Sequence, residues 1–127
     1  MDKKLIIPID IYNIDVEVFI SEDLEKTAEN IDKENNDKEY KLADNISGFM
    51  EGFSSICYQY KNGLITKRFI ILIEEDVSDE TVIHECLHTA WHVLEAKGID
   101  LSHDNHESLA YLQGFLYKKI KNKLLKL

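Results

Sequence analysis

Residues 69–73 form an unbroken apolar run, Phe-Ile-Ile-Leu-Ile. Alternate side chains of a β-strand face opposite sides of the sheet, so this run predicts an interior strand buried on both faces. The pair Asn62-Gly63 lies shortly before it and favours the positive φ angles of a tight hairpin turn. The sequence therefore predicts a hairpin with arms over 53–60 and 64–74.

A second alternating pattern occupies residues 4–20 and changes phase at Asn13. A period of two on both sides of a turn residue predicts a hairpin of two further strands. Ser21 then offers an N-cap to a helix with two acidic residues in its first turn, ending at the polar stretch 35–37. The apolar stripe of this helix consists of Leu24, Ala28 and Ile31.

The last fifty residues predict two helices. Ser78 can cap a helix that runs to about Lys97 and stops at Gly98. A final helix begins near Asp104 and continues into a lysine-rich end, with an apolar stripe of Leu109, Leu112, Leu116 and Ile120.

The expected element order is strand, strand, helix, strand, strand, helix, helix. No repeat or linker interrupts it, so we expect one α+β domain over residues 1–127. We divide this domain into an amino-terminal hairpin and acidic helix over 1–48 and a core over 49–127. The architecture would be a mainly antiparallel sheet of about four strands, packed on the two carboxyl-terminal helices.

The composition excludes several classes of protein. The formal net charge of −9 argues against general affinity for nucleic acid. No segment approaches the roughly 20 apolar residues of a membrane helix, and Asp10 and Asn13 interrupt the start before a signal-peptide core forms. We therefore expect a cytoplasmic protein without membrane or nucleic-acid partners, in which Cys57 and Cys86 are thiols.

The pentapeptide His84-Glu85-Cys86-Leu87-His88 indicates metal-dependent chemistry. At about 100° per residue, the two imidazoles lie about 40° apart on a helix and the glutamate flanks them. Histidines at this spacing can bind one zinc ion while the glutamate acts as general base on zinc-bound water. The alternatives are two surface histidines with ordinary hydrogen bonds, or a zinc that only stabilises the fold. The surface predicted to face the core consists of Val82, Ile83, Cys86, Leu87, Ala90, Val93 and Leu94.

A catalytic zinc needs a third protein ligand and an open position for water. Glu107 lies 19 residues after His88, where a helix returning after Gly98 would bring its carboxylate to the metal. Its alternative role is a capping-box glutamate with Asp104 as the N-cap. His103 and His106 are the other candidates, and either would complete a three-histidine site.

Two further residues are candidates for contacts with substrate. His92 is on the same helix but two turns from His84, too far along to share one tetrahedron. It can line the cleft and bind a substrate oxygen, or be a surface residue paired with Glu95. Tyr111 lies one turn beyond Glu107, where its phenol would donate to an oxyanion or orient the ligand, or simply pack in the core.

The pentapeptide and the segment Glu107-Ser108-Leu109-Ala110-Tyr111 together resemble the gluzincin type of zinc metallopeptidase. More narrowly, they look like small metallopeptidase-like proteins encoded by bacteriophages, over residues 78–117 and more loosely over 49–77. The resemblance implies a zincin-like (minigluzincin) fold, and zinc bound by His84, His88 and Glu107. It also implies a peptide or protein substrate that adds as a strand along 53–60, Glu85 as general base, and location in the host cytoplasm.

The sequence thus favours a zinc-dependent peptidase over two alternatives. One is a zinc-binding module that binds a protein without cutting it, for which an acid at Glu85 is unnecessary. The other is a protease like the SprT-type enzymes of DNA–protein crosslinks, with His103 as third histidine. Such an enzyme is expected to have a basic surface, whereas this chain is acidic.

Overall fold

The computed structural model describes residues 2–126, whose strands form one four-stranded sheet of order β1-β2-β4-β3. The strands are β1 (Lys3–Ile9), β2 (Ile14–Ser21), β3 (Gly52–Lys61) and β4 (Leu64–Glu74). The predicted α+β class and both hairpins are confirmed. Pairs β1–β2 and β3–β4 are antiparallel, whereas β2 and β4 are parallel, so the sheet is mixed.

Asparagine and glycine make the hairpin turns possible. Asn62 and Gly63 have φ of 53° and 78°, and Asn13 has φ of 53°. Asparagine and glycine tolerate this left-handed region better than other residues do. The predicted turn positions are therefore confirmed at both hairpins.

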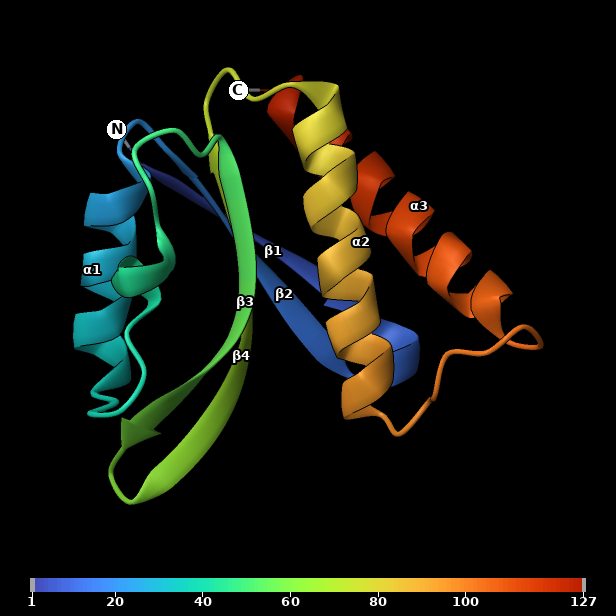
Figure 1. Ribbon diagram of the computed structural model, residues 1–127, viewed down its shortest axis with the longest axis horizontal. Helices are drawn as coiled ribbons and strands as arrows, with labels where there is room; N and C mark the ends of the chain where they lie inside the picture. The colour runs from blue at the N-terminus through green and yellow to red at the C-terminus, as the bar shows by residue number, and fades with distance from the viewer. Residues whose placement is uncertain (1, 127) are drawn as a thin grey trace.

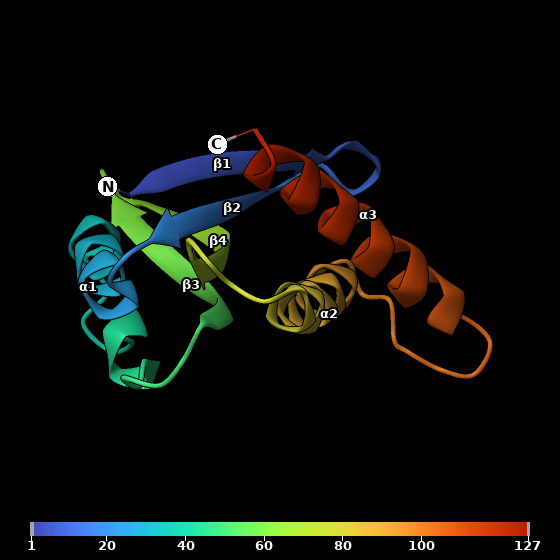
Figure 2. The same cartoon turned by 90° about the horizontal axis from the view of Figure 1, so that it is seen from above.

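Helices cover both faces of the sheet. Helix α1 (Leu24–Asn35) lies on one side, and α2 (Asp79–Ala96) and α3 (His106–Leu124) lie on the other (Figures 1 and 2). Short 3-10 turns occupy Asp10–Tyr12 and Leu42–Asn45. None of the helices within residues 2–126 has the length and apolar character needed to cross a membrane.

Strand β4 supplies side chains to two separate cores. Phe69, Ile71 and Ile73 pack with the side chains of β1, β2, α2 and α3. Ile70 and Leu72 point to the opposite face and pack with α1 and Leu42. The prediction that this strand is buried on both faces is confirmed. The amino-terminal hairpin also shares its core with α2 and α3, so residues 3–21 belong to the same packed unit as the pentapeptide helix.

The helix ends differ from the sequence prediction in two places. Helix α1 is capped by Asp23, whose side chain accepts a hydrogen bond from the Lys26 N–H, because Ser21 is the last residue of β2. Helix α3 begins at His106 after Asn105, so Asp104 is not its N-cap and the capping-box role of Glu107 is wrong. The predicted cap of α2 is confirmed, since Ser78 Oγ accepts from the Thr81 N–H at 3.2 Å.

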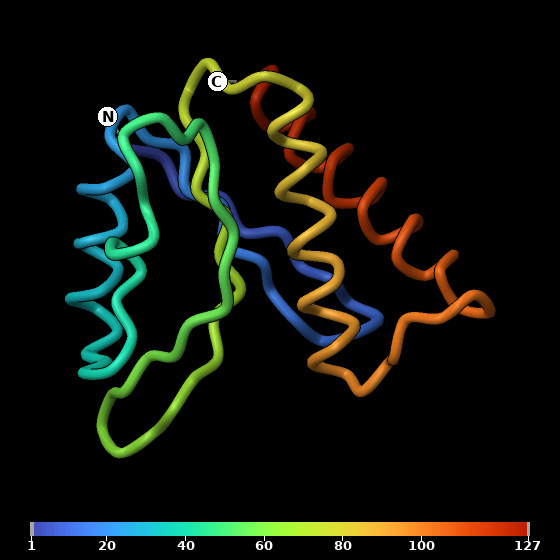
Figure 3. Tube along the Cα trace, in the orientation of Figure 1, coloured from blue at the N-terminus to red at the C-terminus, as the bar shows by residue number. Residues whose placement is uncertain are grey.

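Helices α2 and α3 diverge toward the segment that connects them, residues 97–105 (Figure 3). Contacts between them lie farther along α3. Gln113 Nε2 donates to the Ile83 carbonyl at 3.2 Å, and Lys121 Nζ lies 2.6 Å from Asp79 Oδ1. The first turn of α3 contributes no buried residue.

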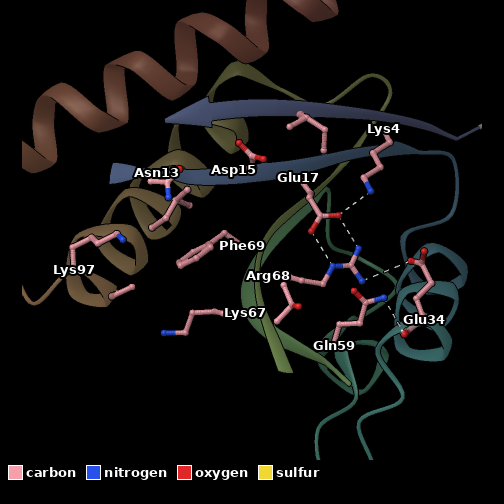
Figure 4. A pocket seen from close by; sticks show the side chains of 14 residues that line it. Lys4, Asn13, Asp15, Glu17, Glu34, Gln59, Lys67, Arg68, Phe69 and Lys97 are labelled. Atoms are coloured by element: carbon pink, nitrogen blue, oxygen red, sulfur yellow. Dashed lines mark hydrogen bonds and ion pairs between the residues drawn. The ribbon is translucent and has the colours of Figure 1, made fainter. Parts of the chain in front are cut away.

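An ion cluster joins α1 to the sheet at one side of a cavity of about 650 Å³ (Figure 4). Arg68 of β4 donates from Nε and Nη2 to the two carboxylate oxygens of Glu17 at 2.8 and 2.7 Å. Its Nη1 donates to Asn35 Oδ1 of α1 at 2.6 Å, and Lys4 Nζ lies 2.9 Å from Glu17 Oε1. Burial opposes ionisation of Glu17, but the hydrogen bonds and charges of Arg68 and Lys4 outweigh it and hold its pKa below 4.5.

This cluster predicts acid sensitivity. Because the pKa of Glu17 is lowered by folding, its ionised form stabilises the fold above pH 4.5 and this contribution is lost as pH falls through the folded pKa. We expect Glu17→Gln to lower the free energy of unfolding at pH 7 by about 3 kcal/mol, and by less at pH 3. Urea denaturation at both pH values measures this, with the exposed Glu29→Gln as control. Equal losses at the two pH values would contradict the prediction.

Candidate metal centre

Helix α2 brings the two histidines of the pentapeptide together on its exposed face. The Nε2 atoms of His84 and His88 are 3.0 Å apart, and the ring centroids are 4.7 Å apart in an edge-to-face arrangement. Both side chains are exposed, as expected from their helical spacing. The predicted convergence of the imidazoles is therefore present.

This spacing fits a shared metal ion. Two nitrogen ligands at about 2.0–2.1 Å from zinc are separated by about 3.3 Å when the coordination is tetrahedral. The observed 3.0 Å between the Nε2 atoms is close to that value. The same distance also fits a hydrogen bond in which one neutral ring donates to the other. The pair thus offers two nitrogen ligands to a soft or borderline cation.

Glu85 differs from its histidine neighbours because it is buried, with 7% of its surface exposed. Its carboxylate Oε1 accepts a hydrogen bond from Ser54 Oγ of β3 at 2.9 Å. The acid therefore lies between helix α2 and the edge strand, with His84 directly before it in sequence. Such a carboxylate can accept a proton from a water held at the imidazoles.

Two cavities of about 320 Å³ each lie beside Glu85, and both are lined by Gly52, His84 and Glu85. The first is also lined by Glu51, Glu80 and Thr81. The second is also lined by Met50, Phe53, Ser54, His88 and His92. The pentapeptide therefore faces hollows between α2 and the start of β3, rather than a flat surface.

The structure places His92 in the second of these cavities, beside Ser54 and Glu85. Burial, and then the nearby His88, lowers the pKa of His92 below 6.5, with a smaller opposing effect from Glu95. This shift favours the neutral ring, which offers both an N–H donor and a lone pair. Its position agrees with the expected place in the cleft.

Cys86 packs in the core, as its place on the helix predicts. It is fully buried among the side chains under α2, and burial together with the Glu85 charge raises the pKa of its thiol to about 12. The thiol belongs to the core side of α2, whereas His84 and His88 are exposed, so Cys86 is not placed to share a metal with them. The prediction that Ile83 also faces the core is wrong, since 42% of its surface is exposed.

Glu107 is not brought to the histidine pair. Its side chain is 72% exposed, and its nearest ionic partner is His106, with Oε1 3.9 Å from Nε2. Tyr111 is 77% exposed on the same face of α3, so the alternative that it packs in the core is wrong. Both line a shallow hollow on α3 with Phe115 and Lys118, which contains no residue of α2.

The other candidate ligands also lie apart from the pair. The rings of His103 and His106 stack on each other, 5.7 Å between centroids, and His106 Nδ1 lies 2.7 Å from the His103 carbonyl oxygen. Within residues 2–126, no group of three or more His, Cys, Asp and Glu side chains is arranged to hold a metal ion. The structure thus assembles His84, Glu85 and His88 but not a third ligand.

Sequence reasoning missed Ser54 and the closeness of Gly52. A β-carbon added at Gly52 would lie 2.8 Å from Thr81 Cγ2 and 3.2 Å from Glu85 Cγ. Glycine at this position therefore allows β3 to approach α2. The available signals were the glycine before a predicted strand and a serine two residues later, neither of which identifies a partner.

Comparisons with protein-family models, curated proteins and solved structures found no match to this chain. The residues of the site are therefore the basis for a function.

The contact at Gly52 predicts a position-specific effect of alanine. Gly52→Ala should lower the free energy of unfolding by about 1–3 kcal/mol, because its methyl group overpacks the interface of β3 and α2. Gly48→Ala is the matched control, since nothing lies within 4 Å of a β-carbon there and its φ is not in the left-handed region. Urea denaturation measures both. Equal effects of the two substitutions would show that the close approach is absent.

Proposed function

We propose that this protein is a zinc-dependent metallopeptidase in which His84 and His88 bind the metal and Glu85 is the general base. The observation that carries the proposal is the convergence of two imidazole Nε2 atoms, 3.0 Å apart, beside a buried carboxylate. A purely structural metal site does not require an acid at that position. The resemblance to gluzincins supports the same reading.

Zinc bound there would supply Lewis acidity, which lowers the pKa of a bound water toward about 7 and polarises a carbonyl group. The protein's own contribution is proton transfer by Glu85. Its carboxylate accepts the proton of the attacking water and then donates it to the leaving amine. Oε1 of Glu85 accepts the hydrogen bond from Ser54 Oγ, so Oε2 is the oxygen available to accept the proton. His92, which lines the same cavity, can hydrogen-bond a substrate oxygen.

Strand β3 gives the proposed substrate a place to bind. It is the last strand of the sheet beside α2, and within residues 2–126 its outer edge pairs with no other strand. A peptide in extended form can add to such an edge through main-chain hydrogen bonds. Residues at the start of β3 line the same cavity as Glu85, so a peptide bound there would pass the carboxylate.

Glu107 remains our proposed third ligand, and it requires a change in the position of the first turn of α3. That turn buries no side chain, whereas the middle and end of α3 are held by Gln113 and Lys121. Movement of this turn toward α2 would displace the partly buried Leu109 from the core, but no fully buried side chain. Tyr111, on the same face one turn later, would move with it.

The central prediction separates metal binding from catalysis. Glu85→Gln keeps an acceptor for Ser54, so we expect zinc content near one per chain. It removes the general base, so we expect kcat to fall by about 1,000-fold. His84→Ala should lower the zinc content itself. Elemental analysis and hydrolysis of a fluorescence-quenched peptide library measure the two properties. Full activity in Glu85→Gln would overturn the mechanism, and zinc without hydrolysis in the wild type would favour a binding module.

A further prediction tests the third ligand. If the carboxylate of Glu107 completes the site, Glu107→Ala should weaken zinc binding by at least 10-fold, while Glu95→Ala, an exposed acid on α2, should not. Competition with a chromogenic chelator measures both affinities. Unchanged affinity in Glu107→Ala would exclude this residue as a ligand. The roles of His84 and His88 are tested separately by the preceding experiment.

A further inference from the structure

The start of β3 and the Glu85 turn of α2 are in direct contact. Gly52 allows this approach, because a side chain there would meet Thr81 and Glu85. Side chains two residues apart in a strand face the same side, so Ser54 also faces α2. The residue paired with Ser54 on β4 is Ile71, which belongs to the core under α2 and α3. The hydroxyl of Ser54 is therefore held against the helix by the sheet.

The hydrogen bond from Ser54 is a defined restraint on Glu85. Ser54 Oγ donates to Oε1 at 2.9 Å, across 31 residues of sequence. A free carboxylate can rotate about its terminal bond, and this bond is a soft torsion. One donor fixed on a strand selects which oxygen is engaged and which remains available. Because Glu85 is 7% exposed, little water competes for Oε1.

We propose that Ser54 is a positioning residue that orients the Glu85 carboxylate for proton transfer. The inference rests on the proposed function, in which Glu85 is the general base. Ser54 belongs to the same strand along which a peptide would add. The strand that would hold the substrate and the group that would take the proton are thus linked by one hydrogen bond, and the reacting groups keep their relative positions.

The adjacent serine provides a matched control. Ser55 is one residue later and faces the other side of the sheet, where its Oγ lies 2.8 Å from the Tyr40 hydroxyl. Its Oγ also donates to the Ile56 carbonyl at 3.1 Å. Ser54→Ala and Ser55→Ala thus each remove a half-buried hydroxyl from the same strand, but only the Ser54 hydroxyl contacts Glu85. Ser54→Thr keeps the hydroxyl and suits a β-strand.

The test compares these variants as zinc-loaded full-length proteins with the peptide library. We expect Ser54→Ala to lower kcat by about 10-fold with KM and zinc content unchanged. Ser54→Thr should recover most of kcat, and Ser55→Ala should keep the wild-type value. A wild-type kcat in Ser54→Ala, or no recovery in Ser54→Thr, would overturn the positioning role while leaving the proposed function intact.

A second measurement does not depend on activity. Melting temperatures of the metal-free wild type, Ser54→Ala, Glu85→Ala and the double variant form a double-mutant cycle. If the hydroxyl and carboxylate are coupled, the shift of the double variant will be smaller than the sum of the single shifts. Additive shifts would overturn the contact itself. If the zinc-loaded wild type hydrolyses no peptide, the proposed function fails, and the cycle still decides whether Ser54 restrains Glu85.

Discussion

Burial of β4 on both faces is the constraint on which the rest of the structure depends. Phe69, Ile71 and Ile73 need apolar cover on one side, and Ile70 and Leu72 need it on the other. A single helical layer cannot supply both, so α1 and the pair α2 and α3 lie on opposite faces of the sheet. Because β4 is interior, its hairpin partner β3 becomes the edge strand beside α2. The candidate site follows from this arrangement.

The elements of this fold could be predicted from local patterns, but their pairing could not. The Asn62-Gly63 turn, the Ser78 cap and the apolar stripe of α1 are each encoded within a few residues. The parallel pairing of β2 with β4 joins Val16 to Phe69, across more than fifty residues. No local period specifies that register, because the alternating pattern of each hairpin accounts only for the pairing of its own two strands. The mixed sheet therefore could not be predicted from the sequence.

The candidate site divides in the same way. His84, Glu85 and His88 could be placed together because one helical turn determines their geometry. Ser54 could not, because its contact with Glu85 depends on how closely a strand packs against that helix. Cys86 could be assigned to the core from helical phase alone, and the structure agrees. Ile83 lies at the boundary of that face, where helical phase alone does not determine whether a side chain is buried or exposed.

Helical phase also explains the position of Glu107. Leu116 is in the core and lies nine residues later, a rotation of about 900° or half a turn beyond two full turns. A helix that buries Leu116 against the sheet must therefore present Glu107 on its outer face. His84 and His88 are exposed on α2 beside the start of β3, whereas the hollow lined by Glu107 contains residues of α3 only. The proposed approach of Glu107 to the imidazoles would tilt the first turn of α3, including the partly buried Leu109, while the core contacts of Leu112, Leu116 and Ile120 could stay in place.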